Sequence, residues 1–338
     1  MASGGGAAAA AEEVTVVENR EWYLCAYAPE GVPTSDHLKL RTVSFSLSAD
    51  AIPDQHVALR VIYISFDPYL RAKMSGHEDG LYVRQFPLDK GIKAFGMGRV
   101  IRSKDIKGMF VAEYSVVPSI FLQKVDPTVA ITLPDHLGCF EVLGKPKPRS
   151  NVFISAAAGG VGMYAGKLAK LKGCPVIGST GSDEKSIGNL SAAMAVLRMT
   201  GSLCIYCRFS PNGIDVYFDN VGGNMLEAVL NHVNNGARIP VCGMISQYSY
   251  HSFVLFNVNK KHVTTRLFNI LAFSKMLHTF MIGSYRDRFG DFAKEMQGYI
   301  KEGKISFKHK ICHGIESFLE GIASMFSSTN IGKVILQI

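Results

Sequence analysis

Short apolar runs rich in strand-favouring residues fill the first part of the chain, between residues 14 and 125. Turn residues such as Pro, Gly and Asp separate these runs, a pattern that is typical of consecutive β-strands. The sequence therefore predicts a β-rich domain in the form of a partly open barrel. We expect its strands at residues 22–26, 38–45, 57–65, 98–101 and 111–117.

Beyond residue 150 strands alternate with helices, which favours an α/β fold with a doubly wound parallel sheet. The stretch 185–209 is too short and too poorly patterned for the helix, strand and helix that such a fold would place there. We expect strands at residues 152–154, 174–180, 213–220, 237–245, 276–282, 304–309 and 333–338. The expected helices span residues 163–172, 224–233, 287–302 and 315–324.

The composition is that of an ordinary globular protein, with 47% hydrophobic and 19% charged residues. The 338 residues are enough for two domains, and no apolar run approaches the ~20 residues that cross a membrane. The net charge of +8 comes from scattered Lys and Arg residues without a basic helix, so we expect no nucleic-acid partner. An anionic small molecule, or plain solubility, accounts for the charge.

Cysteine usage and the N-terminus bear on the compartment. Seven cysteines at irregular spacing argue against a disulfide framework and favour a reducing environment. Residues 1–13 are rich in Ala and Gly and contain no Arg or Lys, so we expect a disordered tail and neither a signal nor a transit peptide. We therefore expect a cytoplasmic protein that does not bind membranes.

One glycine-containing turn follows the predicted strand at residues 152–154. Ala156, Gly159 and Gly162 are spaced so that the backbone can pass close to a pyrophosphate and the next helix can pack against the strand. The helix N-terminus would then present N–H groups to the anion. Turns of this composition are common in α/β proteins, so the spacing leaves a purely structural role open.

Three further residues lie just beyond predicted strands. Asn220 belongs to a turn that either caps the next helix or contacts a cofactor at the carboxyl edge of the sheet. Tyr248 can donate a hydrogen bond to a developing oxyanion or to a ribose, or it can simply pack. Lys185 can meet an anionic group on an adenosine ribose, or be a surface lysine.

Two short motifs suggest zinc, and their spacing argues against it. His77 and Glu78 adjoin in a glycine-bounded loop, and Cys204 and Cys207 form a single Cys-x-x-Cys pair. A structural zinc site needs four ligands, usually from two such pairs. We expect no metal site.

Several motifs occur together in one order along the chain, and as a set they resemble one family. The chain is similar to the plant NADPH-dependent alkenal double-bond reductases, in the prostaglandin reductase branch of the zinc-free medium-chain dehydrogenase/reductase superfamily. The resemblance runs from about residue 14 to residue 338. It rests on residues 18–22 (Glu-Asn-Arg-Glu-Trp), 65–71 (Ser-Phe-Asp-Pro-Tyr-Leu-Arg), the glycine turn, and residues 178–182, 219–223, 242–248, 299–305 and 330–333.

The resemblance implies a fold and a reaction. A GroES-like domain, made from residues 14–132 and 304–338, would pack against a Rossmann domain of residues 133–303 that binds NADPH. The family reduces the carbon–carbon double bond of α,β-unsaturated aldehydes and ketones, usually as a homodimer. Hydride reaches the β-carbon, the carbonyl oxygen carries the negative charge of an enolate, and the α-carbon then takes a proton. The partner implied is thus a small enal or enone.

The resemblance also implies site residues. It assigns Tyr248 to polarising the substrate carbonyl, and Tyr69 and Tyr82 to the substrate pocket. It assigns the pyrophosphate to Asn330 and the glycine turn, and the 2′-phosphate to Lys185 with Ser182 beside it. The full set implied for the cofactor is Ala156, Gly159, Gly160, Gly162, Ser182, Lys185, Asn220, Cys242, Gly243, Phe280, Ile282 and Asn330.

Family segments are missing from the chain at three places, and residues 252–275 look extended relative to the family, so we expect parts of both domains to be missing. A family segment has no counterpart between Gly138 and Cys139, and a strand is absent between Lys107 and Val111. The third Rossmann strand is not found in residues 185–209. These departures leave open a catalytically impaired pseudoenzyme that only binds or dimerises. Related quinone reductases are disfavoured by the motifs at residues 67–71 and 245–248.

Overall fold

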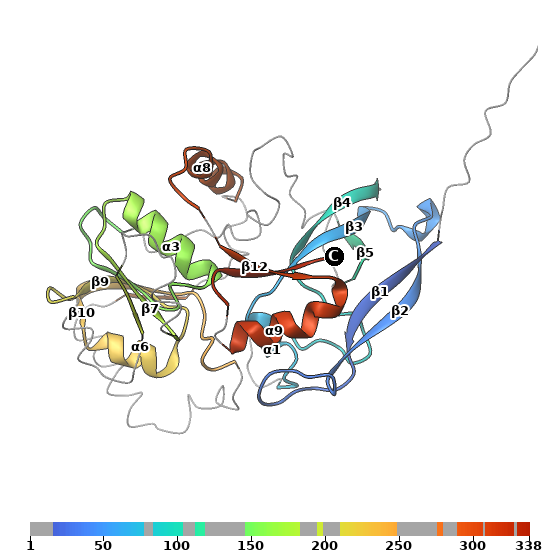
Figure 1. The fold of residues 1–338 in the computed structure, drawn as a ribbon, viewed down its shortest axis with the longest axis horizontal. Coiled ribbons are helices and arrows are strands. Elements are labelled where there is room, and N and C mark those ends of the chain that lie inside the picture. Colours follow the sequence, from blue (N-terminus) through green and yellow to red (C-terminus); the bar gives the residue numbers. More distant parts are fainter. Residues whose placement is uncertain are drawn as a thin grey trace, which may run out of the picture.

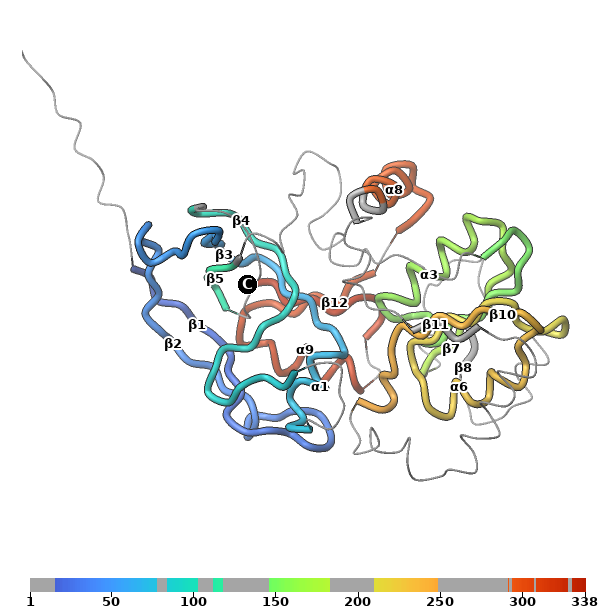
Figure 2. The backbone as a smooth tube through the Cα atoms, turned by 180° about the vertical axis from the view of Figure 1, so that it is seen from behind, coloured from blue at the N-terminus to red at the C-terminus, as the bar shows by residue number. Residues whose placement is uncertain are grey.

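The computed structural model contains two main β-sheets and a separate hairpin (Figure 1). The red C-terminal segment, with β12 (His309–His313) and α9 (Phe318–Phe326), lies between the larger sheet and the hairpin in both views (Figures 1 and 2). The structure describes residues 16–77, 84–103, 112–118, 146–182, 195–198, 210–248, 276–279, 289–306, 308–327 and 330–338.

The six-stranded sheet confirms the predicted doubly wound parallel sheet. Its order is β11-β10-β9-β6-β7-β8, and every neighbouring pair is parallel. The strand order reverses between β6 and β9, which is where such sheets bind ligands at their carboxyl edge. The strands are β6 (Val152–Ile154), β7 (Val176–Thr180), β8 (Ala195–Arg198), β9 (Ile214–Phe218), β10 (Val233–Val241) and β11 (Met276–Thr279).

The predicted loss of the third strand of this sheet was wrong. β8 pairs in parallel with β7, from Ile177 opposite Ala195 to Thr180 opposite Arg198. β8 has only four residues and pairs with one neighbour at the edge of the described sheet. Such a short edge strand leaves no long apolar run in the sequence, and this is why the sequence did not reveal it. The two other departures, at residues 138–139 and 107–111, lie outside the described residues.

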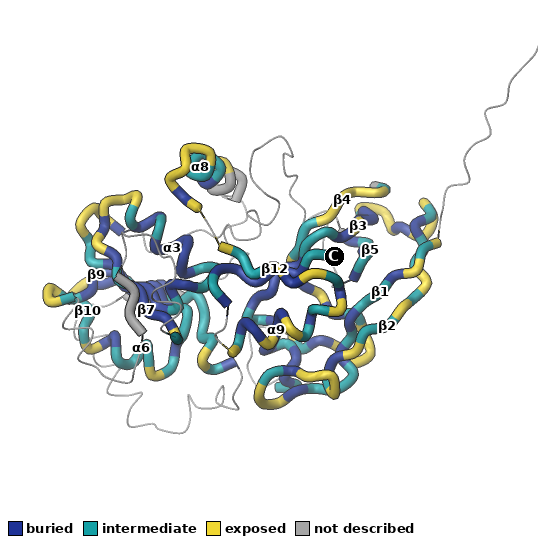
Figure 3. The backbone as a smooth tube through the Cα atoms, viewed as in Figure 1, coloured by how far each residue is buried: buried dark blue, intermediate teal, exposed yellow. Residues whose placement is uncertain are grey.

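Helices cover both faces of the six-stranded sheet, with α3 (Gly160–Leu171) on one face and α6 (Gly223–Leu230) on the other (Figure 1). Successive strand side chains point to opposite faces, so Ile154 packs with Ala165 of α3, and Phe153 packs with Leu230 of α6. This is why β6 is apolar at every position. Figure 3 shows the resulting buried centre of this sheet.

The five-stranded sheet combines strands from both ends of the sequence. β13 pairs with β3 in antiparallel register, and the amide of Ile338 donates to the carbonyl of Ile62 (2.9 Å). α9 (Phe318–Phe326) connects the parallel strands β12 and β13. The strands are β3 (His56–Ser65), β4 (Gly96–Ser103), β5 (Tyr114–Pro118), β12 (His309–His313) and β13 (Lys333–Gln337).

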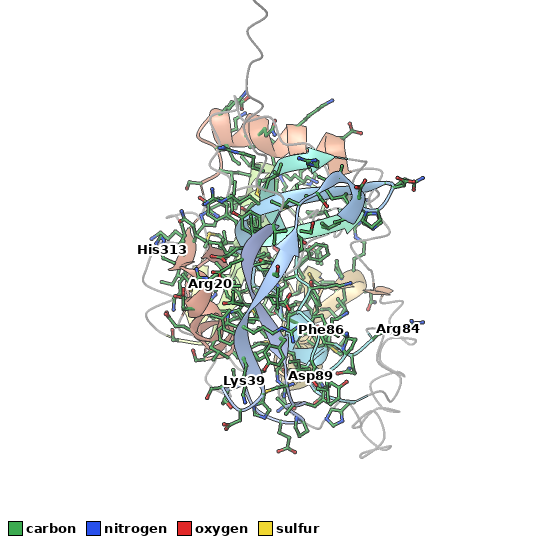
Figure 4. The ribbon with its side chains drawn as sticks, turned by 90° about the vertical axis from the view of Figure 1, so that its right-hand side faces the viewer. Arg20, Lys39, Arg84, Phe86, Asp89 and His313 are labelled. Carbon is green, nitrogen blue, oxygen red and sulfur yellow. The ribbon has the colours of Figure 1, made fainter. Side chains whose placement is uncertain are left out.

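The hairpin of β1 (Val16–Leu24) and β2 (Leu38–Ser46) packs onto this sheet through a shared core. The indole Nε1 of Trp22 donates to the carbonyl of Ile315 (2.7 Å). Arg20, labelled in Figure 4, pairs with Glu113 at 2.7 Å and with Glu316. Two distant segments, one just before β5 and one just before α9, therefore hold the hairpin.

Several predicted boundaries shift for identifiable reasons. The strand expected at residues 304–309 begins only at His309. The amides of Lys304 and Ile305 instead donate to the carbonyl of Tyr299 (2.9 and 3.3 Å), so these residues complete the end of α8 (Phe289–Lys301). Likewise β10 ends at Val241, and the residues after it form a turn.

The domain division remains a proposal, because residues 132–133 lie outside the described ranges. The described strands from residues 56–118 and 309–337 share one sheet, and those from 152–279 share the other. In the described part of the chain, no helix is both long enough and apolar enough to span a bilayer.

We predict that Gly162→Ala destabilises the protein, because its Cβ would lie 2.4 Å from the carbonyl oxygen of Ala156 and 2.8 Å from the Cα of Ala157. We expect the free energy of unfolding to fall by about 1–3 kcal/mol. The matched control is Gly298→Ala in α8, where a Cβ meets nothing within 4 Å. It should raise that free energy by about 0.5–1 kcal/mol. Urea unfolding followed by circular dichroism measures both, and a Gly162→Ala protein as stable as the wild type would contradict the packing argument.

Candidate active site

The glycine turn between β6 and α3 forms one side of the site. Ala156 adopts a left-handed conformation (φ 51°), and its carbonyl accepts the amide of Gly159 at 2.9 Å. The amide of Ala157 donates to Ser179 of β7 (2.8 Å), which ties the turn to the next strand. Because α3 begins at Gly160, the first amides of the helix have no acceptor within it and can bind an anion.

The segment before β13 lies against this turn, as the assignment of Asn330 requires. The amide of Gly332 donates to the carbonyl of Ala158 (2.7 Å), and an isolated parallel bridge joins Gly332 and Gly159. The buried side-chain amide of Asn330 donates to the carbonyl of Gly332 at 3.0 Å. Asn330 therefore shapes the segment that borders the turn.

A buried carboxylate that sequence reasoning missed organises the neighbouring strand end. Asp219 follows β9 and is fully buried. Its Oδ1 accepts four hydrogen bonds: from the hydroxyl of Tyr217 (2.6 Å), the amides of Gly222 (2.9 Å) and Val221 (3.0 Å), and the hydroxyl of Ser155 (3.2 Å). Ser155 and Asp219 are each a polar residue directly after a strand, and that is the signal that could have found them.

Asn220 connects the ends of β6 and β9. Its backbone amide donates to the hydroxyl of Ser155 (2.9 Å), and its side-chain Nδ2 donates to the carbonyl of Ser155 (2.7 Å). The side-chain nitrogen is thus used within the protein. Asn220 lies at the switch point where the sequence placed it, and it braces the two strand ends across that point.

The turn after β10 packs onto the turn after β9. The amides of Cys242 and Gly243 donate to the carbonyl of Asp219 (2.8 and 3.2 Å), and the hydroxyl of Ser246 donates to the carbonyl of Val221 (2.6 Å). The close approach requires glycine at position 222 for two reasons. The residue has φ 67°, which other residues rarely adopt, and a Cβ there would lie only 2.8 Å from Cγ of Met244. The two turns therefore behave as one packed unit.

Tyr248 ends this unit and is only 9% exposed. Its hydroxyl oxygen accepts the amide of Met244 at 3.2 Å and lies 3.6 Å from the position of a Cβ built on Gly243. In this hydrogen bond the phenol oxygen is the acceptor and the backbone N–H of Met244 is the donor. The predicted residues Asn220, Cys242, Gly243 and Tyr248 are thus brought together at one edge of the sheet.

Burial, together with the smaller effect of the carboxylates of Asp219 and Asp67, raises the pKa of the Cys242 thiol to about 12. The thiol is therefore neutral at physiological pH. Asp67 belongs to the segment after β3, so its effect on Cys242 places that segment near the carboxyl end of β10.

Ser182 follows β7, where the resemblance places the 2′-phosphate. Its hydroxyl is buried and has no hydrogen-bond partner among the residues that the structure describes. An orphaned hydroxyl at the carboxyl edge of the sheet fits a group that bonds to a ligand.

Tyr69 begins the short helix α1 (Tyr69–Ala72) and forms an aromatic pair that the sequence did not reveal. Its ring meets that of Phe95 edge-on, with centroids 5.9 Å apart. Phe95 is 60% exposed. One phenylalanine before a strand is ordinary, so no sequence signal marked this pair.

Several assignments lie outside the described residues: Tyr82, Lys185, Phe280 and Ile282, together with Cys204 and Cys207. Within the described ranges, no three His, Cys, Asp or Glu side chains gather in a way that could hold a metal ion.

Comparisons with known proteins agree with this architecture. A family described as the N-terminal domain of oxidoreductase matches residues 20–115, and one described as zinc-binding dehydrogenase matches residues 160–282. The NADP(+)-dependent 2-alkenal reductase of Nicotiana tabacum is 32% identical over 95% of this chain and 98% of its own length. The crystal structure of CurA from Vibrio vulnificus has a TM-score of 0.81 at 27% identity, over 94% of this chain and 98% of that one. The structure of CurA in complex with NADPH has a TM-score of 0.78 at 26% identity, with the same coverage.

The fold and the matched families define a medium-chain dehydrogenase/reductase, with a GroES-like domain and a parallel Rossmann sheet. Within that superfamily, the chain belongs to the zinc-independent NADP-dependent double-bond reductase family.

We predict that Cys242 resists alkylation in the native protein at about pH 8. The thiolate is the form that reacts, and the raised pKa of the Cys242 thiol keeps it protonated at this pH. Cys25, which is half-buried beside the hairpin, is the internal comparison and should react faster. The raised pKa also makes stability fall above pH 9.0, since the unfolded thiol then ionises before the folded one, whose pKa is about 12.

Pulsed labelling with iodoacetamide, read by mass spectrometry of the Cys242 and Cys25 peptides, measures this difference. In urea the two cysteines should label equally. Equal labelling in the native protein would contradict the raised pKa of the Cys242 thiol.

Proposed function

We propose that this protein reduces the carbon–carbon double bond of α,β-unsaturated aldehydes or ketones with NADPH. The observation that carries the proposal is the meeting of three segments at the switch point between β6 and β9: the glycine turn, the segment before β13 and the turn that ends at Tyr248. The name of the tobacco relative and the NADPH complex of CurA support the choice of cofactor and reaction.

The residues present fit NADPH. The first amides of α3 and the turn at Ala156 would hold the pyrophosphate, with Gly162 giving the close packing that such a turn needs. The orphaned hydroxyl of Ser182 would bond to the 2′-phosphate, and we assign Lys185 to the same group. When bound, this cofactor supplies a hydride for the β-carbon of the substrate. Asn330, Asn220, Cys242, Gly243, Phe280 and Ile282 complete the proposed cofactor site.

Tyr248 would donate a hydrogen bond to the substrate's carbonyl oxygen, where negative charge develops. Such a donor lowers the barrier most when it is held in place before the reaction. The amide of Met244 and the packed turns around Gly222 hold the phenol in this way. The buried surroundings of Tyr248 strengthen the bond, because they exclude water.

The ring pair of Tyr69 and Phe95 would provide an apolar wall for the unsaturated chain of the substrate. We place Tyr82 in the same pocket. We also propose a homodimer, and a division into residues 14–132 with 304–338 and residues 133–303.

The test is turnover of a simple enal and a phenylbutenone with NADPH deuterated at the transferred position. We expect loss of NADPH absorbance and a saturated product that retains its carbonyl and carries deuterium on the β-carbon. An alcohol product, or no turnover by a folded protein that binds NADPH, would contradict the proposal, the latter in favour of a binding protein without activity.

We predict that Tyr248→Phe lowers kcat about 10²–10³-fold, because it removes one oxyanion donor. The matched control is Tyr299→Phe, whose hydroxyl donates to Glu295 on the exposed side of α8 (2.9 Å) and should leave kcat unchanged. Equal rates for the two variants would contradict the role given to Tyr248.

A further inference from the structure

Asp67 and Lys333 form a buried ion pair between segments far apart in the sequence. The ammonium of Lys333 donates to Oδ1 of Asp67 at 2.5 Å and to the carbonyl of Phe66 at 2.9 Å. The side chain of Asp67 is only 11% exposed and that of Lys333 only 6%. Two charges taken so far out of water need each other, since removing one partner leaves the other uncompensated.

Lys333 also touches the glycine turn. A Cβ built on Gly160 would lie 2.9 Å from Cδ and 3.2 Å from Cα of Lys333, so the lysine packs against the first residue of α3. The preceding residue, Gly332, bonds to Ala158 of the same turn. The position of Lys333 is therefore tied to the backbone that would hold the pyrophosphate.

Asp67 is tied in turn to the helix that carries Tyr69. Its Oδ2 accepts the hydroxyl of Ser65 at 2.6 Å, and its carbonyl accepts the amide of Leu70 at 3.0 Å in the first turn of α1. The amide of Phe66 donates to the carbonyl of Val334 (3.2 Å), which reinforces the connection to β13. One ion pair thus connects the glycine turn with the aromatic pair of Tyr69 and Phe95.

We propose that Asp67 and Lys333 are positioning residues for the reduction: their ion pair fixes the distance between the bound nicotinamide cofactor and the substrate wall. The inference rests on the proposed function. Neither residue needs to touch the reacting atoms. Both act through the backbone of the glycine turn and of α1, and a shift of about 1 Å between reacting atoms costs about 10²-fold in rate.

A purely structural role makes a different prediction, and the double variant separates the two. Asp67→Asn and Lys333→Met each leave one buried charge unpaired and should both lower stability. The double variant Asp67→Asn/Lys333→Met leaves no uncompensated charge, so it should regain most of that stability. If the pair only stabilises the fold, activity returns with stability. If it positions the cofactor turn and α1, activity stays low.

The experiment measures urea unfolding, NADPH affinity by nicotinamide fluorescence, kcat and KM for an enone, and amide exchange over residues 66–72 and 156–163. We expect the double variant to unfold near the wild-type urea concentration and to bind NADPH within about threefold of the wild type, but to lose about 10²-fold in kcat. Amide exchange should increase in both segments together.

The control is the more exposed ion pair of Arg41 and Glu21 on the β1–β2 hairpin (2.6 Å), whose side chains are 36% and 15% exposed. Arg41→Met/Glu21→Gln should change none of these quantities. A double variant at Asp67 and Lys333 with wild-type kcat would overturn the positioning role alone. Wild-type protein that reduces no enone would overturn the proposed function and the positioning role with it.

Discussion

The arrangement of the candidate site depends on the buried ion pair between Asp67 and Lys333. The two residues are 266 positions apart, and neither charge has solvent to compensate it. The pair can form only when β13 has entered the five-stranded sheet beside β3, and when Gly332 has reached the glycine turn of the other sheet. A single contact therefore links the C-terminal strand to both halves of the molecule.

A second buried charge has a complementary role at the carboxyl edge of the six-stranded sheet. Oδ1 of Asp219 accepts four hydrogen bonds, from the residue after β6, from β9 and from the turn that follows β9. The carbonyl of Asp219 then holds the turn after β10, which ends at Tyr248. Asp219 thereby orders the turns after β9 and β10. Asp67 and Lys333 set the position of the glycine turn relative to the ring pair of Tyr69 and Phe95.

Much of the fold followed from periodicity. The apolar run at β6, the glycine turn and the alternation of strands and helices predicted the parallel sheet and its carboxyl edge, because a strand buried on both faces must be apolar throughout. β8 escaped prediction, since four residues at the sheet edge leave almost no pattern. The strand expected at residues 304–309 begins later, because Ile305 follows the end of α8 and packs with Tyr164 of α3. No local sequence pattern encodes this contact between distant segments.

The site was predictable only in part. Asn220, Gly243 and Tyr248 follow strands whose ends share one edge, so position along the chain was enough to bring them together. Asp67, Lys333 and Phe95 owe their roles to contacts between distant segments. Their neighbours in sequence say nothing of those contacts, and only the folded chain shows them.

The most direct test of the account is a titration of the purified protein with NADPH, followed by the fluorescence of the bound nicotinamide, with NADH as the control. We expect micromolar binding of NADPH, a clear preference over NADH, and displacement by 2′,5′-ADP more readily than by 5′-ADP. Those results would mean that the carboxyl edge of the six-stranded sheet, from Ser182 after β7 to the glycine turn after β6, binds the cofactor. A folded protein that binds neither nucleotide would contradict the central claim, because the turns would then have no cofactor to position.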